Sequence, residues 1–318
     1  MVAGTQAIYA WGNHDRCLLS CPQETDNHTA AVVRAIERMR GELASPLSLS
    51  DLATTGLFSP FHFHRMFRLA TTMTPARFLA ALRMAQARRL LLHSGLTVAA
   101  IGSRVGYTSI GTFTTQFTRL VGESPLRFRE LVRGLGDRPI GEMLAAAGFA
   151  APASATHPYG LTVVELRRED DAGVPKSWCV AARSRAMWLD RTPAVGEYEA
   201  RVLLIDARAT PTDALVDDVA GSYLTGGATL RLSSSGQLGG PAEIALRPPR
   251  ATDPPVLSSA PLRWLAGLPS GVWDGGNDLL ASAAQVGDRL GAVRPQGTAW
   301  RVHPTPPLSM QAAGVGHP

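Results

Sequence analysis

Between residues 47 and 130 the sequence contains one pattern twice, and this duplication restricts the fold more than any other feature. Before the second predicted helix of each copy the two patterns are 49 positions apart, and from that helix onward they are 50 apart. The larger shift superimposes Ser59 on Ser109, Phe63 on Phe113, Phe67 on Phe117, Thr74 and Pro75 on Ser124 and Pro125, and Arg77 and Phe78 on Arg127 and Phe128. A repeat of this kind indicates that one supersecondary unit is used twice.

Each copy is predicted to form a helix–turn–helix. In the first copy Ser59 is an N-cap, Pro60 takes the first helical position, and Phe63 and Phe67 follow on one face. Small residues at equivalent places, Ala53 and Gly102, allow the two helices of each copy to approach closely. The phenylalanines are expected to fill a core, as they would in any helical bundle. The evidence for a function therefore lies in the residues between them.

The charge of this region favours a nucleic-acid partner over a plain bundle. Residues 29–133 contain 14 arginines, no lysine and five acidic residues, a net charge of +9, whereas the whole chain carries +5. Arginines that neutralise phosphates release counterions, so a basic balance concentrated on paired helix–turn–helix units is typical of a protein that binds duplex DNA.

The motifs of both copies resemble those of the AraC/XylS-type DNA-binding domain, over about residues 30–133. The first copy contributes SPFHFHRMF (59–67), TPARFL (74–79), Arg83, Met84, Ala87, Leu90 and Leu91. The second contributes Ala100 to Gly102, Val105 to Tyr107, Ser109, Thr112, Phe113, Gln116, Phe117, Gly122, Ser124, Pro125 and Arg127 to Arg129. The resemblance implies two helix–turn–helix units joined by one long helix, about residues 75–94. It also implies two recognition helices in successive major grooves, which lie ~34 Å apart on one face of DNA.

Two positions depart from that family pattern. Thr72 stands where the family usually has the glycine that ends the first recognition helix, and Gly102 stands where it often has alanine. A β-branched residue is poorly suited to a left-handed C-cap, so the end of the first recognition helix is left open.

The two recognition helices are expected to contribute differently. Arg65 is the side chain best able to make a bidentate contact to guanine, and His64 can donate to or accept from a base edge. Phe61 suits either a thymine methyl group or the core. The second helix has no arginine directed at the bases, so its contribution is expected to be weaker and more dependent on DNA shape, with Thr115 and Gln116 as its best contacts. The complete set of predicted DNA-binding residues is Ser59, Phe61, His64, Arg65, Arg68, Ser109, Ile110, Thr112, Thr115, Gln116 and Arg119.

The rest of the chain is predicted to be organised around a β-rich region. Residues 1–28 show no periodicity and are expected to be irregular, and residues 134–158 are expected to be a linker. Short apolar runs between turn residues predict strands in residues 159–250, with an effector or dimerisation role. Residues 251–318 are predicted to be a proline- and glycine-rich tail with one helix, about Asp278 to Leu290. The predicted fold is thus multi-domain: an all-α N-terminal double helix–turn–helix domain, then a β-rich, sandwich-like C-terminal region.

The favoured function is that of a sequence-specific transcriptional regulator. Its expected partners are double-stranded DNA, RNA polymerase and a small-molecule effector at the C-terminal region. No catalytic residues, cofactor or metal are predicted, since Cys17, Cys21 and His14 lack the second ligand pair of a closed zinc site. No apolar run is long enough to span a membrane, and three cysteines indicate no disulfide framework, so a cytoplasmic location is expected. Two alternatives stay open: an enzyme or ligand-binding protein whose activity lies in the C-terminal half, tethered to DNA by the N-terminal domain, and an architectural protein indifferent to DNA sequence.

Overall fold

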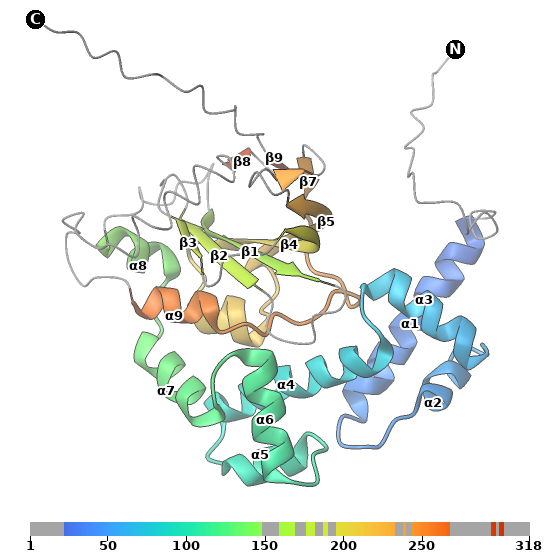
Figure 1. Cartoon of the computed structure of the whole chain (residues 1–318). Helices are drawn as coiled ribbons and strands as arrows, with labels where there is room; N and C mark the ends of the chain where they lie inside the picture. The colour runs from blue at the N-terminus through green and yellow to red at the C-terminus, as the bar shows by residue number, and fades with distance from the viewer. Residues whose placement is uncertain are drawn as a thin grey trace, which may run out of the picture.

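The computed structural model of the protein describes residues 22–147, 159–168, 176–181, 187–189, 195–232, 238–239, 243–267, 294–296 and 299–301 (Figure 1). Its helices are α1 (Pro22–Gly41), α2 (Leu49–Thr54), α3 (Pro60–Thr71), α4 (Pro75–His93), α5 (Val98–Arg104), α6 (Ile110–Val121), α7 (Pro125–Leu135), α8 (Ile140–Ala146) and α9 (Ala260–Ala266), with one π-helical turn, η1 (Asp213–Asp217). Its strands are β1 (Tyr159–Arg167), β2 (Lys176–Ala181), β3 (Met187–Leu189), β4 (Gly196–Asp206), β5 (Tyr223–Leu232), β6 (Leu238–Gly239), β7 (Glu243–Ala245), β8 (Arg294–Gln296) and β9 (Ala299–Arg301).

The duplicated sequence forms two pairs of helices on either side of α4. We call α2 with α3 the first unit and α5 with α6 the second unit. In each unit a short helix, a turn and a longer helix follow one another, and a serine N-cap begins the longer helix. The connecting helix was expected at residues 75–94, and α4 runs from Pro75 to His93 with Thr74 as its N-cap. The helical content of the N-terminal region is therefore as predicted.

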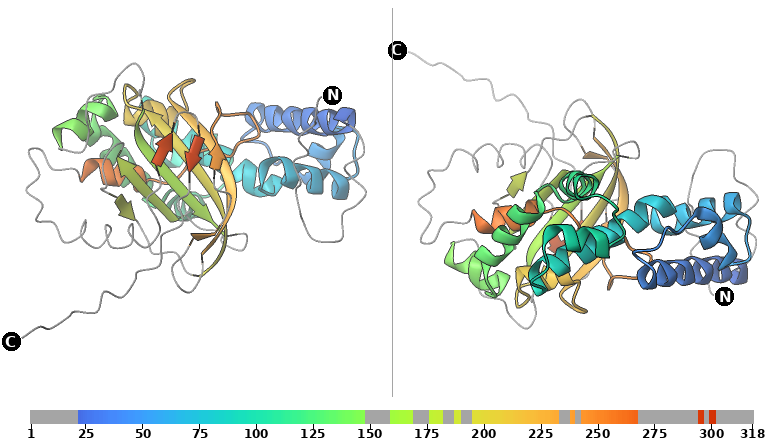
Figure 2. Two further views of the ribbon diagram at one scale, coloured as in Figure 1. Left: turned by 90° about the horizontal axis from the view of Figure 1, so that it is seen from above. Right: turned by 90° about the horizontal axis from the view of Figure 1, so that it is seen from below.

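The two units differ in the core to which they belong. Side chains of α1, α2, α3 and the first half of α4 form one buried cluster, which includes Phe63, Phe67 and Phe78. Phe113, Phe117 and Phe128 belong to a second, larger cluster that continues through α7 and α8 into β1, β4, η1 and α9. The first unit consequently projects to one side, whereas the second unit lies against the body of the protein (Figure 2).

The C-terminal region contains a six-stranded sheet of order β3-β2-β1-β4-β5-β6, and every neighbouring pair is antiparallel. Leu161 and Val163 of β1 face the helices, because they share the large cluster with residues of α7, α8 and α9. Val164 and Val202 point to the other face and are also completely buried. A sheet region is thus present as predicted. On the first of these faces, however, it packs against helices and not against a second sheet as in a sandwich.

A second, three-stranded sheet has the order β7-β9-β8. It is linked to the larger sheet where Thr225 and Arg247 exchange two backbone hydrogen bonds of 2.8 and 2.9 Å. From Arg247 the chain continues to the start of α9 through residues 247–259, which we call the strap and which contain one turn at residues 250–253. The strap passes between the sheet and α4, so it connects the C-terminal region to the helical region.

Several predicted segment boundaries were wrong. Helix α1 begins at Pro22, so residues 22–28 are not irregular. The predicted linker contains α8, whose Ile140 and Leu144 are completely buried and whose first N–H groups donate to the carbonyls of Ala209 and Ala207. The predicted tail contains the strap, α9, β8 and β9, while the helix expected at Asp278 to Leu290 lies outside the described residues. The segments that contain α8 and the strap are rich in glycine and proline, and contacts with distant residues order them despite weak local propensity.

Among the described residues, no helix is both long and apolar enough to cross a membrane.

Candidate nucleic-acid interface

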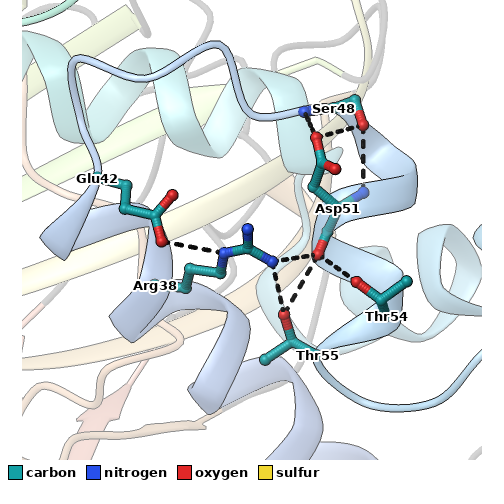
Figure 3. Close-up of polar contacts among 6 residues, drawn as sticks. All are labelled: Arg38, Glu42, Ser48, Asp51, Thr54 and Thr55. Atoms are coloured by element: carbon teal, nitrogen blue, oxygen red, sulfur yellow. Dashed lines mark hydrogen bonds and ion pairs between the residues drawn. The ribbon is translucent and has the colours of Figure 1, made fainter.

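Helix α2 is held in place from α1 before the chain reaches the first recognition helix (Figure 3). The Arg38 guanidinium donates to the Asp51 carbonyl at 2.6 Å and to the Glu42 carboxylate at 3.2 Å. Ser48 and Asp51 form a capping box, in which the Ser48 N–H donates to the Asp51 carboxylate and the Asp51 N–H donates to the Ser48 hydroxyl oxygen. Hydrogen bonds from the Ser48 hydroxyl, at 2.6 Å, and from the Ser48 N–H to the Asp51 carboxylate hold the pKa of Asp51 below its usual value. The start of the first unit is therefore fixed by charge-assisted contacts.

The first recognition helix, α3, buries one face and exposes the other. Phe63 and Phe67 are completely buried, whereas Phe61 is 83% exposed. His64 and Arg65 are half-buried, and Arg68 is exposed. Phe61 therefore does not pack in the core, and its contact with a thymine methyl group stays a prediction.

His62 belongs to the interior side of the first unit. Its ring stacks edge-on against Phe58 and His28, with centroids 5.2 and 5.4 Å apart. Among the described residues, no group of three or more His, Cys, Asp or Glu could hold a metal ion.

The second recognition helix, α6, presents a hydroxyl-rich surface with one cationic side chain, Arg119, in its last turn. Ser109 accepts from the Thr112 N–H at 3.1 Å and donates its hydroxyl to Thr112 Oγ1 at 2.9 Å. Ile110 is 55% exposed and Thr115 is exposed. Arg119 donates to the Gln116 side-chain oxygen at 2.8 Å. The Gln116 oxygen is therefore occupied within the protein, and its NH₂ group is the part left for an outside partner.

All eleven predicted contact residues lie on α3, α6 or their N-caps, and each is at least partly exposed. Each N-cap hydroxyl accepts the N–H of the third helical residue, at His62 in α3 and Thr112 in α6. The first helical residue of α6 is Ile110, whereas that of α3 is Pro60, which has no N–H. The start of α6 consequently offers one more backbone donor for an anion than the start of α3.

The turns of the two units share backbone geometry but not residue type. Gly106 in the second turn has φ of 88°, and Leu57 at the matching place in the first has φ of 59°. Gly122 ends α6 with φ of 93°, and Thr72 ends α3 with φ of 59°. The question left open by the sequence is thus answered: α3 ends at the same point as α6, with a threonine in the left-handed conformation. Non-glycine residues there cost roughly 1–2 kcal/mol each.

Arg83 joins the two units, a role that the sequence did not reveal. From α4 its guanidinium donates to the carbonyls of Leu43 at 2.8 Å and Ser45 at 2.9 Å, in the loop after α1. The same guanidinium lies over the Tyr107 ring, 5.9 Å from its centroid. Gly106 packs against this loop so closely that a Cβ would lie 2.8 Å from the Leu43 carbonyl oxygen. This junction sets the placement of one unit relative to the other.

Arg129 of α7 repeats this arrangement in the second unit. It donates to the carbonyl of Leu91, in the last turn of α4, at 2.8 Å and to that of Leu96, in the loop that follows, at 3.0 Å. The repeat shift of 50 positions does not superimpose Arg83 on Arg129, so the duplication itself carries no signal for this pair. Both arginines were counted toward the basic charge, yet both are used for internal contacts.

The C-terminal region forms hydrogen bonds and an ion pair with the second unit and with α4. The Ser259 N–H donates to the carbonyl of Val121, the last residue of α6, at 2.8 Å. Arg263 of α9 forms an ion pair with Glu123 at 3.3 Å. Arg88 of α4 is 1% exposed and donates to the carbonyls of Leu215 and Val256. Burial lowers the pKa of Arg88 to about 9, and the nearby Glu165 partly opposes that shift. The end of the second recognition helix is therefore attached to a region outside the duplicated motif.

The helical region is similar in sequence to known proteins. Residues 52–131 match the family model described as a helix-turn-helix domain. The chain is 35% identical over 95 residues to the MmsAB operon regulatory protein of Pseudomonas aeruginosa, covering 30% of this chain and 31% of that protein. It is 31% identical over 98 residues to the transcriptional activator RhaR of Escherichia coli, covering 31% of this chain and 35% of that protein.

A solved structure titled as a transcriptional regulator with an AraC-type DNA-binding domain, from Chromobacterium violaceum, is also similar. It is 23% identical, covers 33% of this chain and 94% of that chain, and has a TM-score of 0.32. The chain thus spans about a third of the length of the two curated relatives. Over residues 52–131 the chain is thus similar to helix-turn-helix transcriptional regulators of the AraC type.

Proposed function

We propose that the chain is a sequence-specific transcriptional regulator that inserts α3 and α6 into successive major grooves of duplex DNA. The observation that carries this proposal is the repeated unit itself, in which a short helix positions a capped helix with an exposed outer face. Because α4 joins the two units and the Arg83 junction holds them together, both recognition helices are presented by one rigid frame. That arrangement suits a bipartite DNA site.

The two helices supply different kinds of contact in this proposal. Arg65 makes the principal base contact, with His64 and Phe61 beside it, and Arg68 fixes register on phosphate. In the second unit, Thr115 and the Gln116 NH₂ group contact the bases, while Ser109, Ile110 and Thr112 bring the N-terminus of α6 to a phosphate. Arg119 supports Gln116 through their hydrogen bond. The first half-site is therefore read with the greater stringency.

Binding changes transcription because the bound protein contacts RNA polymerase or blocks its access to the promoter. A small-molecule effector, bound through the C-terminal region, regulates that step. The hydrogen bond from Ser259 to Val121 and the ion pair of Arg263 with Glu123 attach the C-terminal half to the second unit. These contacts support a regulatory role for the C-terminal half.

Selection of bound sites from a random duplex pool tests the proposal, with binding repeated at two salt concentrations. The full chain is used, because the core of the second unit includes residues of the sheet and α9 and a helical fragment would expose it. An enriched motif of two half-sites, about one helical turn apart, is expected. Absence of any enriched motif, together with a steep salt dependence, would mean phosphate binding alone and would reject sequence-specific regulation.

A further inference from the structure

A cavity of about 340 Å³ lies between the helical region and the C-terminal region. This volume falls within the range of small-molecule sites, which extend from roughly 300 to 1,000 Å³. Its walls come from α1, α4, η1 and the strap, and its lining residues are Arg40, Leu43, Leu82, Ala85, Gln86, Arg89, Ala214, Leu215, Val216, Asp218, Pro255 and Val256. None of the eleven predicted DNA-binding residues lines this cavity.

The residues that line the cavity are mostly apolar, with basic side chains among them. Eight of its twelve lining residues are apolar, so they suit a hydrocarbon or aromatic body. Its charged residues are Arg40, Arg89 and Asp218. Asp218 already accepts a hydrogen bond from the Tyr223 hydroxyl. Counted over the lining side chains, the two arginines and the one aspartate leave an excess of one positive charge.

The two arginines differ in how far their guanidinium groups are already bonded to other residues of the protein. Arg89 donates to the Asp217 carbonyl at 2.8 Å, and its Nε lies 4.0 Å from the Asp217 carboxylate. Arg40 is exposed at the end of α1, and no ion pair joins it to any other residue in the described part of the chain. A ligand with one negative group can thus pair with Arg40 while its apolar part lies against Leu82, Ala85 and Val256.

The cavity is mechanically connected to α4, the helix that carries both units. Arg88 of α4 donates to the carbonyls of Leu215 and Val256, and these two residues also line the cavity. A ligand in the cavity contacts α4, η1 and the strap at the same time. It can do so only while the C-terminal region is docked on α4. Its binding free energy therefore favours the docked arrangement.

We propose that this cavity binds a small apolar monocarboxylate and that its occupancy changes the affinity of the protein for DNA. The coupling to DNA rests on the proposed function, and it acts in both directions by thermodynamic reciprocity. The proposal assigns the effector site to the junction between the two regions and its charge recognition to Arg40 and Arg89.

Calorimetric titration of the full chain without DNA tests the site. The probes are octanoate, phenylacetate and indole-3-acetate, with octan-1-ol and 2-phenylethanol as uncharged counterparts. At least one carboxylate is expected to bind with a Kd below ~1 mM, and its alcohol counterpart at least fivefold more weakly. Binding of none of the three acids, or equal binding of acid and alcohol, overturns the proposal.

Variants locate the bound probe. Arg40→Gln and Arg89→Gln are each expected to weaken binding of the carboxylate at least fivefold. Arg34→Gln removes the same charge from an exposed position of α1 that does not line the cavity, and it should leave the titration unchanged. An equal effect of all three substitutions would show nonspecific attraction to a basic surface and would reject the site.

A second measurement tests the coupling. With the selected duplex, a saturating carboxylate is expected to change the Kd for DNA at least threefold in the wild-type chain and not in Arg40→Gln. An unchanged Kd in the wild type overturns the coupling. If instead no DNA motif can be selected, the proposed function fails, while the calorimetric result without DNA still decides the cavity.

Discussion

The two units begin from one repeated sequence pattern and end in different structural situations. The first unit has a core of its own with α1, and its contacts with the rest of the protein include α4, the Arg83 junction and a contact of Arg167 with Met73. The second unit shares its core with the sheet, and the strap and α9 hold the end of its recognition helix. Two units that share a sequence pattern therefore need not be equally stable or equally coupled to the C-terminal region. We expect the first unit to dominate base recognition and the second to respond to the C-terminal region.

Substitution of Arg88 should produce the largest difference in stability between the two units. Arg88→Ala leaves two buried carbonyls without their donor and Glu165 without its nearby positive charge, so a loss of about 3–5 kcal/mol in the free energy of unfolding is expected. Urea denaturation measures the loss. Hydrogen exchange should locate faster exchange in α5 to α7 and β1, with α1 to α3 unaffected. Arg34→Ala, an exposed arginine, serves as the control and should stay within about 0.5 kcal/mol. Equal acceleration in both units would contradict the division into two cores.

Loss of the Arg83 junction should alter the spacing between the units. Arg83→Ala removes two hydrogen bonds to loop carbonyls, and a destabilisation of about 2–3 kcal/mol is expected. The selected DNA motif should then tolerate half-site spacings that the wild type rejects. Arg83→Lys keeps the charge but cannot hold both carbonyls in the same fork geometry, so it should show the same relaxed spacing. Unchanged spacing in both variants would mean that α4 alone sets the distance.

Base recognition should be unequal between the two helices. Arg65→Ala is expected to cost ~1–3 kcal/mol of binding free energy and to relax preference at one base pair. Gln116→Ala should cost less, at most about 1 kcal/mol, because its oxygen is already bonded to Arg119. Competition binding against singly substituted duplexes measures both. A uniform loss across all duplexes in Arg65→Ala would make that residue a phosphate contact.

Exchange of the helix-ending residues should give the smallest effects, with opposite signs. Thr72→Gly relieves a left-handed threonine and is expected to stabilise the protein by about 0.5–1 kcal/mol. Gly122→Thr places a β-branched residue at φ of 93° and should destabilise it by about 1–2 kcal/mol. Thermal unfolding measures both. Shifts of opposite sign would show that the two helix ends differ in residue type and not in backbone conformation, whereas a neutral Thr72→Gly would show that threonine contributes an offsetting contact.

Much of the helical region could be predicted because its signals are local. The N-caps Ser59 and Ser109 and the phenylalanines at helical spacing depend on neighbours within a few residues. Those signals were enough to place α3, α4 and α6 and to predict which residues of α3 and α6 are exposed. The family assignment came from the same short-range pattern.

The amino-acid sequence by itself thus determined the repeat, the capped helices and the residues on their outer faces. Tertiary structure decided which arginines face outward and which, like Arg83, Arg88 and Arg129, hold loops and strap together. It also decided that Ile140 and Leu144 of the expected linker join the core, and that a cavity forms where α4 meets the strap. The physical reason is that a guanidinium or an isolated apolar side chain carries no local information about its partner. Only the folded chain brings the carbonyls of Leu215 and Val256 to Arg88.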